Sequence, residues 1–413
     1  MSRNFTVLGA GIVGVCTALA LQREGWNVTL VDRDEPGRGC SFGNAGIIHT
    51  GGCVPLATPG IAGRAPGMLL DPEGPLVIRW RYLPRLLPWL LRMAAASRPD
   101  RVEASSRALA PLALAARGAY LPVLKEAAAE SLLRSRGELY VYRTRAAFES
   151  AGWEMNVRRR FGVPVEELEG DAVRAVEPAL APEYRLAHYQ SASAFIVNPF
   201  RLVQSLAALF MLKGGRILKT EVRAARPDGS GGAVLATADG DLAAASLVVC
   251  TGAYSGPFSA SFGSQVPLET WRGYHIMVPN GIVQLNGVVI DGDMRFAVTP
   301  MEEGIRAAGL IELASLDAPP DYARADLFLK LARSLLPGFP REATSRWMGH
   351  RPGMPDTVPV IGRSSQHRNV YFNFGHGMLG LTFGAITGQL LAEVAANRRP
   401  QIDMTPYRAE RFH

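Results

Sequence analysis

The sequence has few lysines for so basic a chain. Of its 413 residues 44 are basic, yet only Lys125, Lys213, Lys219 and Lys330 are lysines, and the arginines are scattered along the chain. The formal charge of +7 therefore reflects a general preference for arginine. It does not indicate a basic face for nucleic acid, and we expect no nucleic-acid partner.

Other features are missing as well. The four cysteines show no Cys-x-x-Cys pair and no cysteine–histidine spacing that suits zinc, so we expect neither a disulfide framework nor a bound metal. No run of about 18 apolar residues could span a membrane. The first apolar stretch runs directly into glycines and does not resemble a signal peptide. With 48% hydrophobic residues the chain can bury a large core, and these observations predict a cytoplasmic globular enzyme.

The N-terminal residues have the pattern of a strand, a glycine turn and a helix. The buried-strand pattern Phe5–Leu8 is followed by Gly9, Gly11 and Gly14 and by a helical stretch at Val15–Arg23. The first glycine permits the tight turn, the second lets the backbone approach a pyrophosphate, and the third lets the helix pack on the strand. The helix N-terminus then offers N–H groups to a phosphate.

A second strand, Val28–Val31, ends at Asp32, eighteen residues after Gly14. A carboxylate at this place can accept hydrogen bonds from ribose hydroxyls, and Arg33 lies beside it. Strand, glycines, helix, second strand and acid in this register predict a dinucleotide site. The motif alone does not distinguish NAD from FAD.

The rest of the chain favours FAD. An NAD dehydrogenase would continue with strand–helix repeats, whereas here the second strand leads into a glycine-rich loop at 39–49, which suits close contact with a large planar cofactor. A buried strand at 247–250 breaks at Thr251 and Gly252, where the backbone can again approach the nucleotide. The glycine-rich turn at 374–382 precedes the last helix, whose N-terminus can hold an anion.

The order of these blocks along nearly the whole chain resembles the FAD-dependent amine and amino-acid oxidoreductases, which include D-amino-acid oxidase, glycine and sarcosine oxidases and bacterial D-amino-acid dehydrogenases. The stretch Trp347–Thr382 is its most specific part. The motif Ser-Phe-Gly-Asn-Ala-Gly at 41–46 is most similar to the D-amino-acid dehydrogenases, which usually have threonine in place of Cys40 and alanine in place of Gly43. Neither change removes a group that a flavin needs.

The resemblance implies FAD as the cofactor. Sarcosine-oxidase relatives hold the flavin through a cysteine near the C-terminal motif, but no cysteine follows Cys250 here, so we expect non-covalent FAD. The residues expected to contact it are Gly9, Gly11, Gly14, Asp32, Arg33, Ser41, Asn44, Ala45, Gly46, Val222, Thr251, Gly252, Gly375, Gly377, Met378, Gly380, Leu381 and Thr382.

Arg351 is the main candidate for substrate binding. Relatives similar to glycine oxidase have an arginine at this position that grips the substrate carboxylate, and a guanidinium matches a carboxylate with two hydrogen bonds. A salt bridge to the loop of Asp356 is the structural alternative. Further candidates, for which packing roles are about equally plausible, are Tyr274 and His376 as catalytic residues and Tyr274, His49 and Arg272 as substrate contacts.

The implied reaction transfers a hydride from the α-carbon of a D-amino acid to flavin N5, giving an imino acid that water hydrolyses to a 2-oxo acid and ammonia. D-proline or hydroxy-D-proline would give a cyclic imine. The cofactor carries this chemistry, so no side-chain base is required. Two alternatives stay open, namely glycine or sarcosine oxidation with oxygen and a dinucleotide-binding protein without turnover.

The positions of the lysines bear on which electron acceptor the enzyme uses. Relatives that react well with oxygen often have a lysine beside the flavin, whereas Lys330 is the only lysine after residue 219 here and lies in a surface-like helical stretch. This favours a dehydrogenase that passes electrons to a quinone or another acceptor.

The expected fold is α/β, with a Rossmann-type FAD-binding domain and an α+β substrate domain. Patterns at 265–278 and 291–313 predict an antiparallel sheet over the flavin, and 102–129 predicts helices. Substrate would lie between this sheet and the flavin. We assign residues 1–57, 195–262 and 346–413 to the FAD-binding domain and residues 58–194 and 263–345 to the substrate domain.

Residues 76–96 are the nearest approach to a membrane-active segment. Four arginines alternate there with leucines, Trp89 and Met93. A basic amphipathic segment with tryptophan can lie in a membrane interface. A helix packed over the substrate domain explains the pattern equally well. The sequence thus leaves open whether a cytoplasmic protein also contacts the inner face of the cell membrane through this segment.

Overall fold

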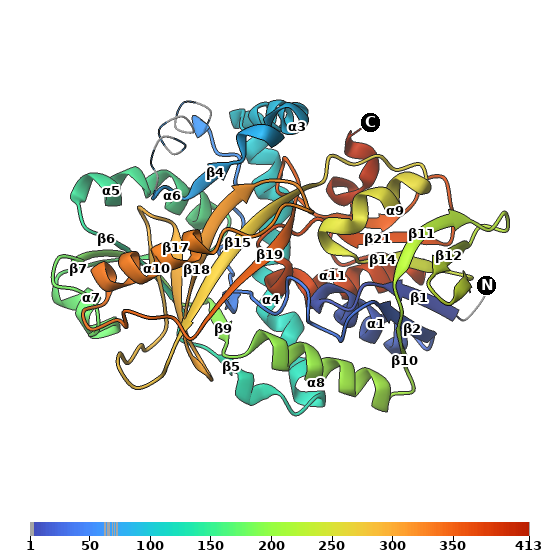
Figure 1. Ribbon diagram of the computed structural model, residues 1–413, viewed down its shortest axis with the longest axis horizontal. Coiled ribbons are helices and arrows are strands. Elements are labelled where there is room, and N and C mark those ends of the chain that lie inside the picture. Colours follow the sequence, from blue (N-terminus) through green and yellow to red (C-terminus); the bar gives the residue numbers. More distant parts are fainter. Residues whose placement is uncertain are drawn as a thin grey trace.

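The computed structural model describes residues 4–412 except 62, 64–66, 68, 70 and 72. Two parts lie side by side in Figure 1, one built on a mostly parallel sheet and the other on a larger mixed sheet. Segments far apart in the sequence contribute to both parts. The predicted α/β fold with an antiparallel-rich second sheet is confirmed.

The six-stranded sheet begins with the N-terminal strand. All its neighbouring strands pair in parallel except the last two. Its central strands are almost fully buried, because layers of structure cover both faces. In order, the strands are β10 (Arg216–Lys219), β2 (Asn27–Asp32), β1 (Asn4–Leu8), β14 (Leu247–Val249), β21 (Val370–Phe374) and β20 (Val360–Arg363).

Alternate residues of its central strands serve two separate cores. Val248 of β14 joins the helix-covered core, whereas Leu247 and Val249 face the other side. The helices on the first face are α1 (Ile12–Arg23), α4 (Pro99–Glu126), α8 (Pro199–Leu212) and α11 (Gly380–Ala395). The second face is covered by α9 (Ser255–Ser261) and a small sheet of β11 (Val222–Pro227), β12 (Ala233–Thr237) and β13 (Gly240–Ala244).

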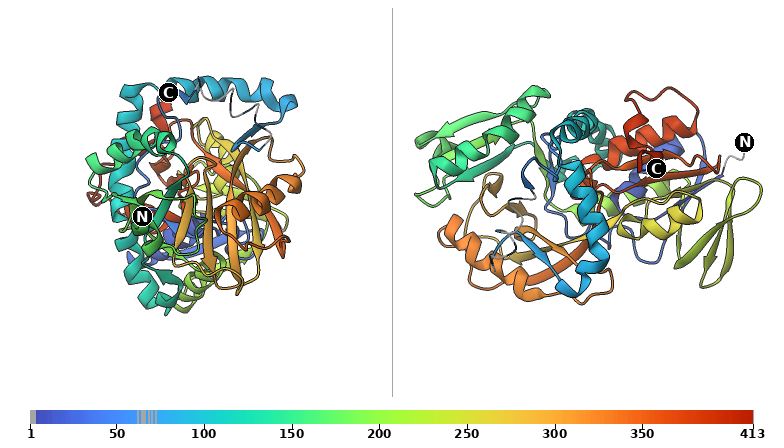
Figure 2. Two further views of the ribbon diagram at one scale, coloured as in Figure 1. Left: turned by 90° about the vertical axis from the view of Figure 1, so that its left-hand side faces the viewer. Right: turned by 90° about the horizontal axis from the view of Figure 1, so that it is seen from above.

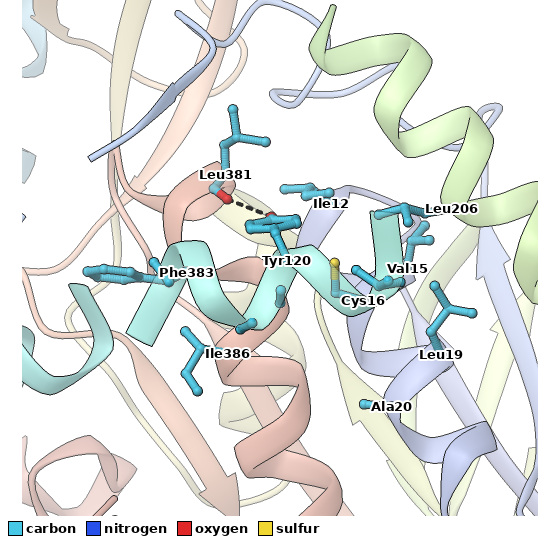
Figure 3. Packing of buried hydrophobic residues seen from close by; sticks show 14 of the residues in the cluster. Ile12, Val15, Cys16, Leu19, Ala20, Tyr120, Leu206, Leu381, Phe383 and Ile386 are labelled. Atoms are coloured by element: carbon cyan, nitrogen blue, oxygen red, sulfur yellow. Dashed lines mark hydrogen bonds between the residues drawn. The ribbon is translucent and has the colours of Figure 1, made fainter. Parts of the chain in front are cut away.

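Helices α1, α4 and α11 pack closely on one another (Figure 3). The hydroxyl of Tyr120 in α4 donates to the carbonyl oxygen of Leu381 at the start of α11, at 2.6 Å. A Cβ on Gly388 of α11 would lie 2.9 Å from the carbonyl oxygen of Cys16, so glycine is what lets α11 approach α1. These contacts fix the N-termini of α1 and α11 relative to each other.

The large sheet is mainly antiparallel. Helix α10 (Tyr322–Leu335) packs on its outer face, where Phe328 and Leu335 join Ile276 in a third core (Figure 1). In order, its strands are β19 (Ser345–Gly353), β15 (Glu269–Val278), β18 (Gly304–Leu313), β17 (Phe296–Met301), β16 (Val288–Asp291), β6 (Glu138–Tyr142), β8 (Leu186–Gln190) and β7 (Glu166–Glu169), with β4 (Leu76–Ile78) paired to β18.

A three-stranded sheet of β3 (Ile47–Ile48), β9 (Ala194–Ile196) and β5 (Leu133–Arg134) completes the strands. Further helices are α3 (Leu83–Ala96), α5 (Arg145–Ser150), α6 (Gly152–Arg160) and α7 (Asp171–Val176), with short 3-10 turns at 80–82, 130–132, 252–254, 405–407 and 409–412.

Two segments lie elsewhere than the predicted domain division places them. Residues 345–353 form β19, all of which pairs with β15 in the large sheet. The helices expected at 102–129 are the single helix α4, which continues through Pro111 and Pro122 and packs against the six-stranded sheet's helices. Small buried side chains such as Ala113 allow that close packing. The domain boundaries themselves stay a prediction.

Candidate functional site

A cavity of about 1310 Å³ lies between the six-stranded sheet and the large sheet. Its wall combines the carboxyl ends of β1 and β2 and the N-termini of α1 and α11 with β18 and β19. Ligands of α/β sheets bind at the carboxyl ends of the strands. This volume exceeds the roughly 300–1,000 Å³ of a pocket for one small ligand. The cavity can hold a dinucleotide together with a small substrate.

The glycine turn at one end leaves no room for side chains. Gly9 has a φ of +105°, and a Cβ there would lie 2.5 Å from the carbonyl oxygen of Cys250. A Cβ on Gly14 would lie 1.8 Å from the carbonyl oxygen of Gly9. Asp32 braces the same turn, since its Oδ2 accepts a hydrogen bond from the Ala10 amide at 2.6 Å. The backbone is thus exposed to the cavity at a rigid turn.

The loop at 39–46 is held by helix α1 on one side and by the large sheet on the other. Ser41 Oγ accepts a hydrogen bond from the amide of Ile12, the first residue of α1, at 3.0 Å. Arg306 reaches the same loop from β18 and donates to the carbonyl oxygen of Asn44 at 2.6 Å. Burial lowers the pKa of Arg306 to about 10, so it stays charged at neutral pH. Arg306 adjoins a strand predicted to lie over the flavin, but strand alternation does not show this contact, which joins residues 262 positions apart.

Trp347 occupies a slot beside this loop. Its ring stacks on His275, with ring centres 5.2 Å apart, and His275 Nδ1 lies 3.0 Å from the carbonyl oxygen of Gly43. A Cβ on Gly43 would lie 2.0 Å from the indole, and one on Gly349 would lie 1.9 Å from it. Burial lowers the pKa of His275 to about 3, so the ring is neutral. The slot therefore requires both glycines.

Arg351 is a half-buried cation without an acidic partner among the described residues. Its guanidinium donates to the carbonyl oxygens of Leu310 at 2.7 Å and Gly309 at 3.2 Å, and burial lowers its pKa. To reach β18 from β19 the side chain crosses β15 at Gly273, where a Cβ would lie 2.0 Å from the guanidinium carbon. Asp356, the alternative partner expected from the sequence, pairs with Arg411 at 2.9 Å.

Comparison with known proteins identifies the family. The model of the FAD dependent oxidoreductase family matches residues 4–394. The chain belongs to this family. It is 35% identical to a D-amino-acid oxidase of Bradyrhizobium diazoefficiens over 99% of both chains, and 32% identical to D-amino acid dehydrogenase 1 of Mesorhizobium japonicum over 98% of this chain and 99% of the relative. Its fold is similar to that of glycine oxidase from Geobacillus kaustophilus, with a TM-score of 0.79 at 20% identity over 98% of both chains.

FAD is thus the cofactor of this oxidoreductase, and the cavity fits it. Glycine turns expose their backbone to the cavity, as binding of a pyrophosphate requires, whereas Gly14, Gly46 and Gly375 do not line it. The individual cofactor contacts stay predictions. The predicted residues that line the cavity are Gly9, Gly11, Asp32, Arg33, Ser41, Asn44, Ala45, Val222, Thr251, Gly252, Gly377, Met378, Gly380, Leu381 and Thr382.

Of the predicted substrate and catalytic residues of the oxidoreductase, Arg351, His49 and His376 line the cavity. Arg272 and Tyr274 are not among the lining residues, and their contact with substrate stays a prediction. Neighbouring residues of a strand point to opposite faces, and Arg351 crosses β15 at the residue between these two. Tyr274 donates to Glu312 at 2.6 Å, and Arg272 lies 3.3 Å from the same carboxylate.

The two histidines at the cavity differ in their surroundings. His376 Nε2 lies 3.2 Å from Thr387 Oγ1, and burial lowers the pKa of His376 to about 3, which leaves a neutral ring. His49 Nδ1 lies 2.5 Å from Glu138 Oε1, and Ser193 Oγ donates to the same oxygen at 3.1 Å. Glu138 is 89 residues from His49, and no motif in the sequence marks it.

Proposed function

We propose that this oxidoreductase oxidises D-amino acids. Relatives named D-amino-acid oxidase and D-amino acid dehydrogenase, 31–35% identical over nearly the whole chain, support this substrate class. In the proposed reaction the α-carbon gives up a hydride to the bound FAD, and water hydrolyses the imino acid to a 2-oxo acid and ammonia. D-proline and hydroxy-D-proline belong to the substrates to be tested.

The observation that carries the proposal is Arg351. Its guanidinium lies half-buried on the cavity wall, and within the described part of the chain it bonds only to carbonyl oxygens, so its positive charge is uncompensated there. A substrate carboxylate neutralises that charge and forms a bidentate pair. Because Arg351 is held over β18, the carboxylate would be fixed at the large sheet with the α-carbon toward the FAD-binding wall.

His49 is proposed as a second substrate contact. The Glu138 carboxylate next to Nδ1 favours the tautomer with the proton on Nδ1, which leaves Nε2 as an acceptor for a substrate N–H. His49→Gln should raise KM for D-amino acids more than it changes the rate at saturation, since this role concerns binding. An unchanged KM would remove His49 from the substrate site.

For the electron acceptor we propose a quinone or a similar molecule, which makes the enzyme a dehydrogenase. No lysine lines the cavity within the described part of the chain. Lys330 lies on α10, is 61% exposed and pairs with Glu73. Oxygen as acceptor, as in amine oxidases of the glycine and sarcosine type, is the second candidate, and the D-amino-acid oxidase relative favours it. We further propose that FAD is held non-covalently in a cytoplasmic enzyme.

The test is anaerobic mixing of the purified holoenzyme with D- and L-amino acids, glycine, sarcosine and hydroxy-D-proline, followed by the visible absorbance of oxidised flavin. We expect D-substrates to bleach the flavin and L-substrates to leave it oxidised. Readmitted air or added quinone then identifies the acceptor, and acid precipitation shows whether FAD is released. A flavin that no amine bleaches would overturn the substrate proposal and leave a dinucleotide-binding protein without this turnover.

A further inference from the structure

Helix α3 and the turn before it present an apolar stripe to solvent. Trp80 is 67% exposed, Leu87 50% and Leu91 63%. Pro84 and Pro88, on the same side of the helix as Leu87 and Leu91, are exposed too. Isolated exposed apolar residues are ordinary, but a continuous stripe along one helix face indicates a contact surface. Figure 1 shows α3 at the outer margin of the molecule.

The opposite side of α3 is firmly anchored. Leu86 is fully buried and Trp89 is 6% exposed. The Trp89 indole donates to the carbonyl oxygen of Pro267 at 3.1 Å and meets Trp271 edge-on, with ring centres 5.9 Å apart. The core-facing side of α3 is therefore packed against the protein, and the exposed stripe is the outward side of a fixed helix.

The charges within the segment that carries the stripe have one sign. Residues 76–98 include five arginines and neither aspartate nor glutamate. Arg81, Arg85 and Arg92 are exposed beside the stripe. Arginines flanking exposed leucine and tryptophan match a surface with negative headgroups over an apolar layer. A protein partner or a second copy of this chain, whose net charge is +7, matches this pattern less well.

The same helix also forms part of the cavity wall. Trp89, Leu90, Leu91, Met93 and Ala94 line the cavity, so Leu91 belongs both to the wall and to the exposed stripe. The cavity thus extends to the outer surface beside the stripe, along an apolar wall. An apolar molecule dissolved in a membrane would meet this wall first if α3 lay on the membrane.

We propose that the exposed face of α3 docks on an anionic lipid bilayer and that an apolar electron acceptor enters the cavity from the bilayer along Leu90 and Leu91. The docking rests on the surface of α3 alone, whereas the entry of an acceptor rests on the proposed dehydrogenase function. The two parts are therefore tested separately.

Docking is tested by flotation of the holoenzyme with vesicles of phosphatidylcholine alone or with about a third of phosphatidylglycerol. We expect binding to the anionic vesicles, weakened by salt because exposed charges are screened. Trp80→Ser/Leu87→Ser should reduce it about tenfold or more, and Arg85→Gln/Arg92→Gln about fivefold for each arginine lost. Leu212→Ser, which alters an 85% exposed leucine on α8, is the matched control and should bind like the unaltered enzyme.

Either of two results would overturn the docking proposal. One is the absence of flotation at low salt. The other is a dimer of the unaltered enzyme in sedimentation that Trp80→Ser/Leu87→Ser converts to a monomer, which would make α3 an interface between two copies.

Acceptor entry is tested by turnover with a long-chain quinone in anionic vesicles against a water-soluble dye. Trp80→Ser/Leu87→Ser should slow turnover with the vesicle quinone by the same factor by which it weakens vesicle binding. Turnover with the dye should be unchanged, since neither residue lines the cavity. If the double variant and the unaltered enzyme turned over the vesicle quinone at equal rates, the entry route would be overturned. Failure of D-amino acids to bleach the flavin would instead refute the proposed function, and the flotation result would still stand.

Discussion

Gly43→Ala tests how closely the cofactor loop is fitted to the large sheet. The added Cβ would lie 2.0 Å from the Trp347 indole, and ordinary contact begins at 3.4 Å, so ring and loop must separate by about 1.4 Å. The ring cannot simply move away, because His275 stacks against it and Gly349 is equally close to it. Overpacking of this kind typically costs about 1–3 kcal/mol of unfolding free energy.

This cost corresponds to a fall in Tm of about 1–3 °C, from an unfolding entropy of about 2.1 cal/mol/K per residue. Thermal unfolding of the holoenzyme measures it, and dissociation of FAD on dilution should become faster. The double variant Gly43→Ala/Trp347→Leu should recover most of the loss relative to Trp347→Leu alone. Gly118→Ala is the control with the opposite sign. Its Cβ enters open space on the exposed face of helix α4, and alanine favours the helix more than glycine does, so this change should stabilise the protein.

The reasoning fails if Gly43→Ala is as stable as the unaltered enzyme and holds FAD equally well. It also fails if the effects of Gly43→Ala and Trp347→Leu simply add, because residues in direct contact should show a coupling energy of about 0.5–3 kcal/mol. The cost of alanine at this position would be a property of the indole opposite.

Three further outcomes are expected. Arg351→Met should slow flavin reduction by limiting D-amino acid about 10- to 150-fold, the worth of a charge-assisted hydrogen bond, and a normal rate would discount the carboxylate role. Gly273→Ala should have a similar effect with the fold intact by circular dichroism, because its Cβ displaces the Arg351 guanidinium. Burial lowers the pKa of His188 to about 4 and the pKa of His275 and His376 to about 3. Below pH 6.5 these histidines therefore bind more protons in the unfolded chain than in the folded one, and the free energy of unfolding should fall as the pH is lowered from 6.5 to 4. The fall should be less steep in His188→Asn.

The parts of the site that depend on neighbouring residues were predictable from the sequence. A buried strand, three glycines and a helix follow one another at the N-terminus. Gly14 is required by the carbonyl oxygen of Gly9 in the same turn, and Gly9 by Cys250 at the end of the adjacent strand. The last helix and its glycine turn were predictable for the same reason. The sequence signal of both turns is local.

The contacts between distant strands were not predictable. Arg272 and Tyr274 were expected at the substrate, but the pairing of β15 with β18 is irregular between them, and Gly273 is the position at which Arg351 crosses the strand. Alternation gives two faces and does not say which one is the cavity. Likewise nothing near Glu138 or Arg306 in the sequence shows that they meet His49 and Asn44.

The loop at 39–46 has a consequence for the order in which the enzyme matures. Two residues of the large sheet hold this loop, and both are synthesised much later than the loop itself. Arg306 follows Asn44 by 262 residues, and His275 follows Gly43 by 232 residues. During synthesis the glycine turn and the first helix can form early, because domains of nascent chains fold from the N-terminus. The loop lacks its contacts with His275 and Arg306 until β15 and β18 have been synthesised and have paired. A nascent chain should therefore take up its flavin only near the end of translation, and a truncated chain ending before β15 should not retain it.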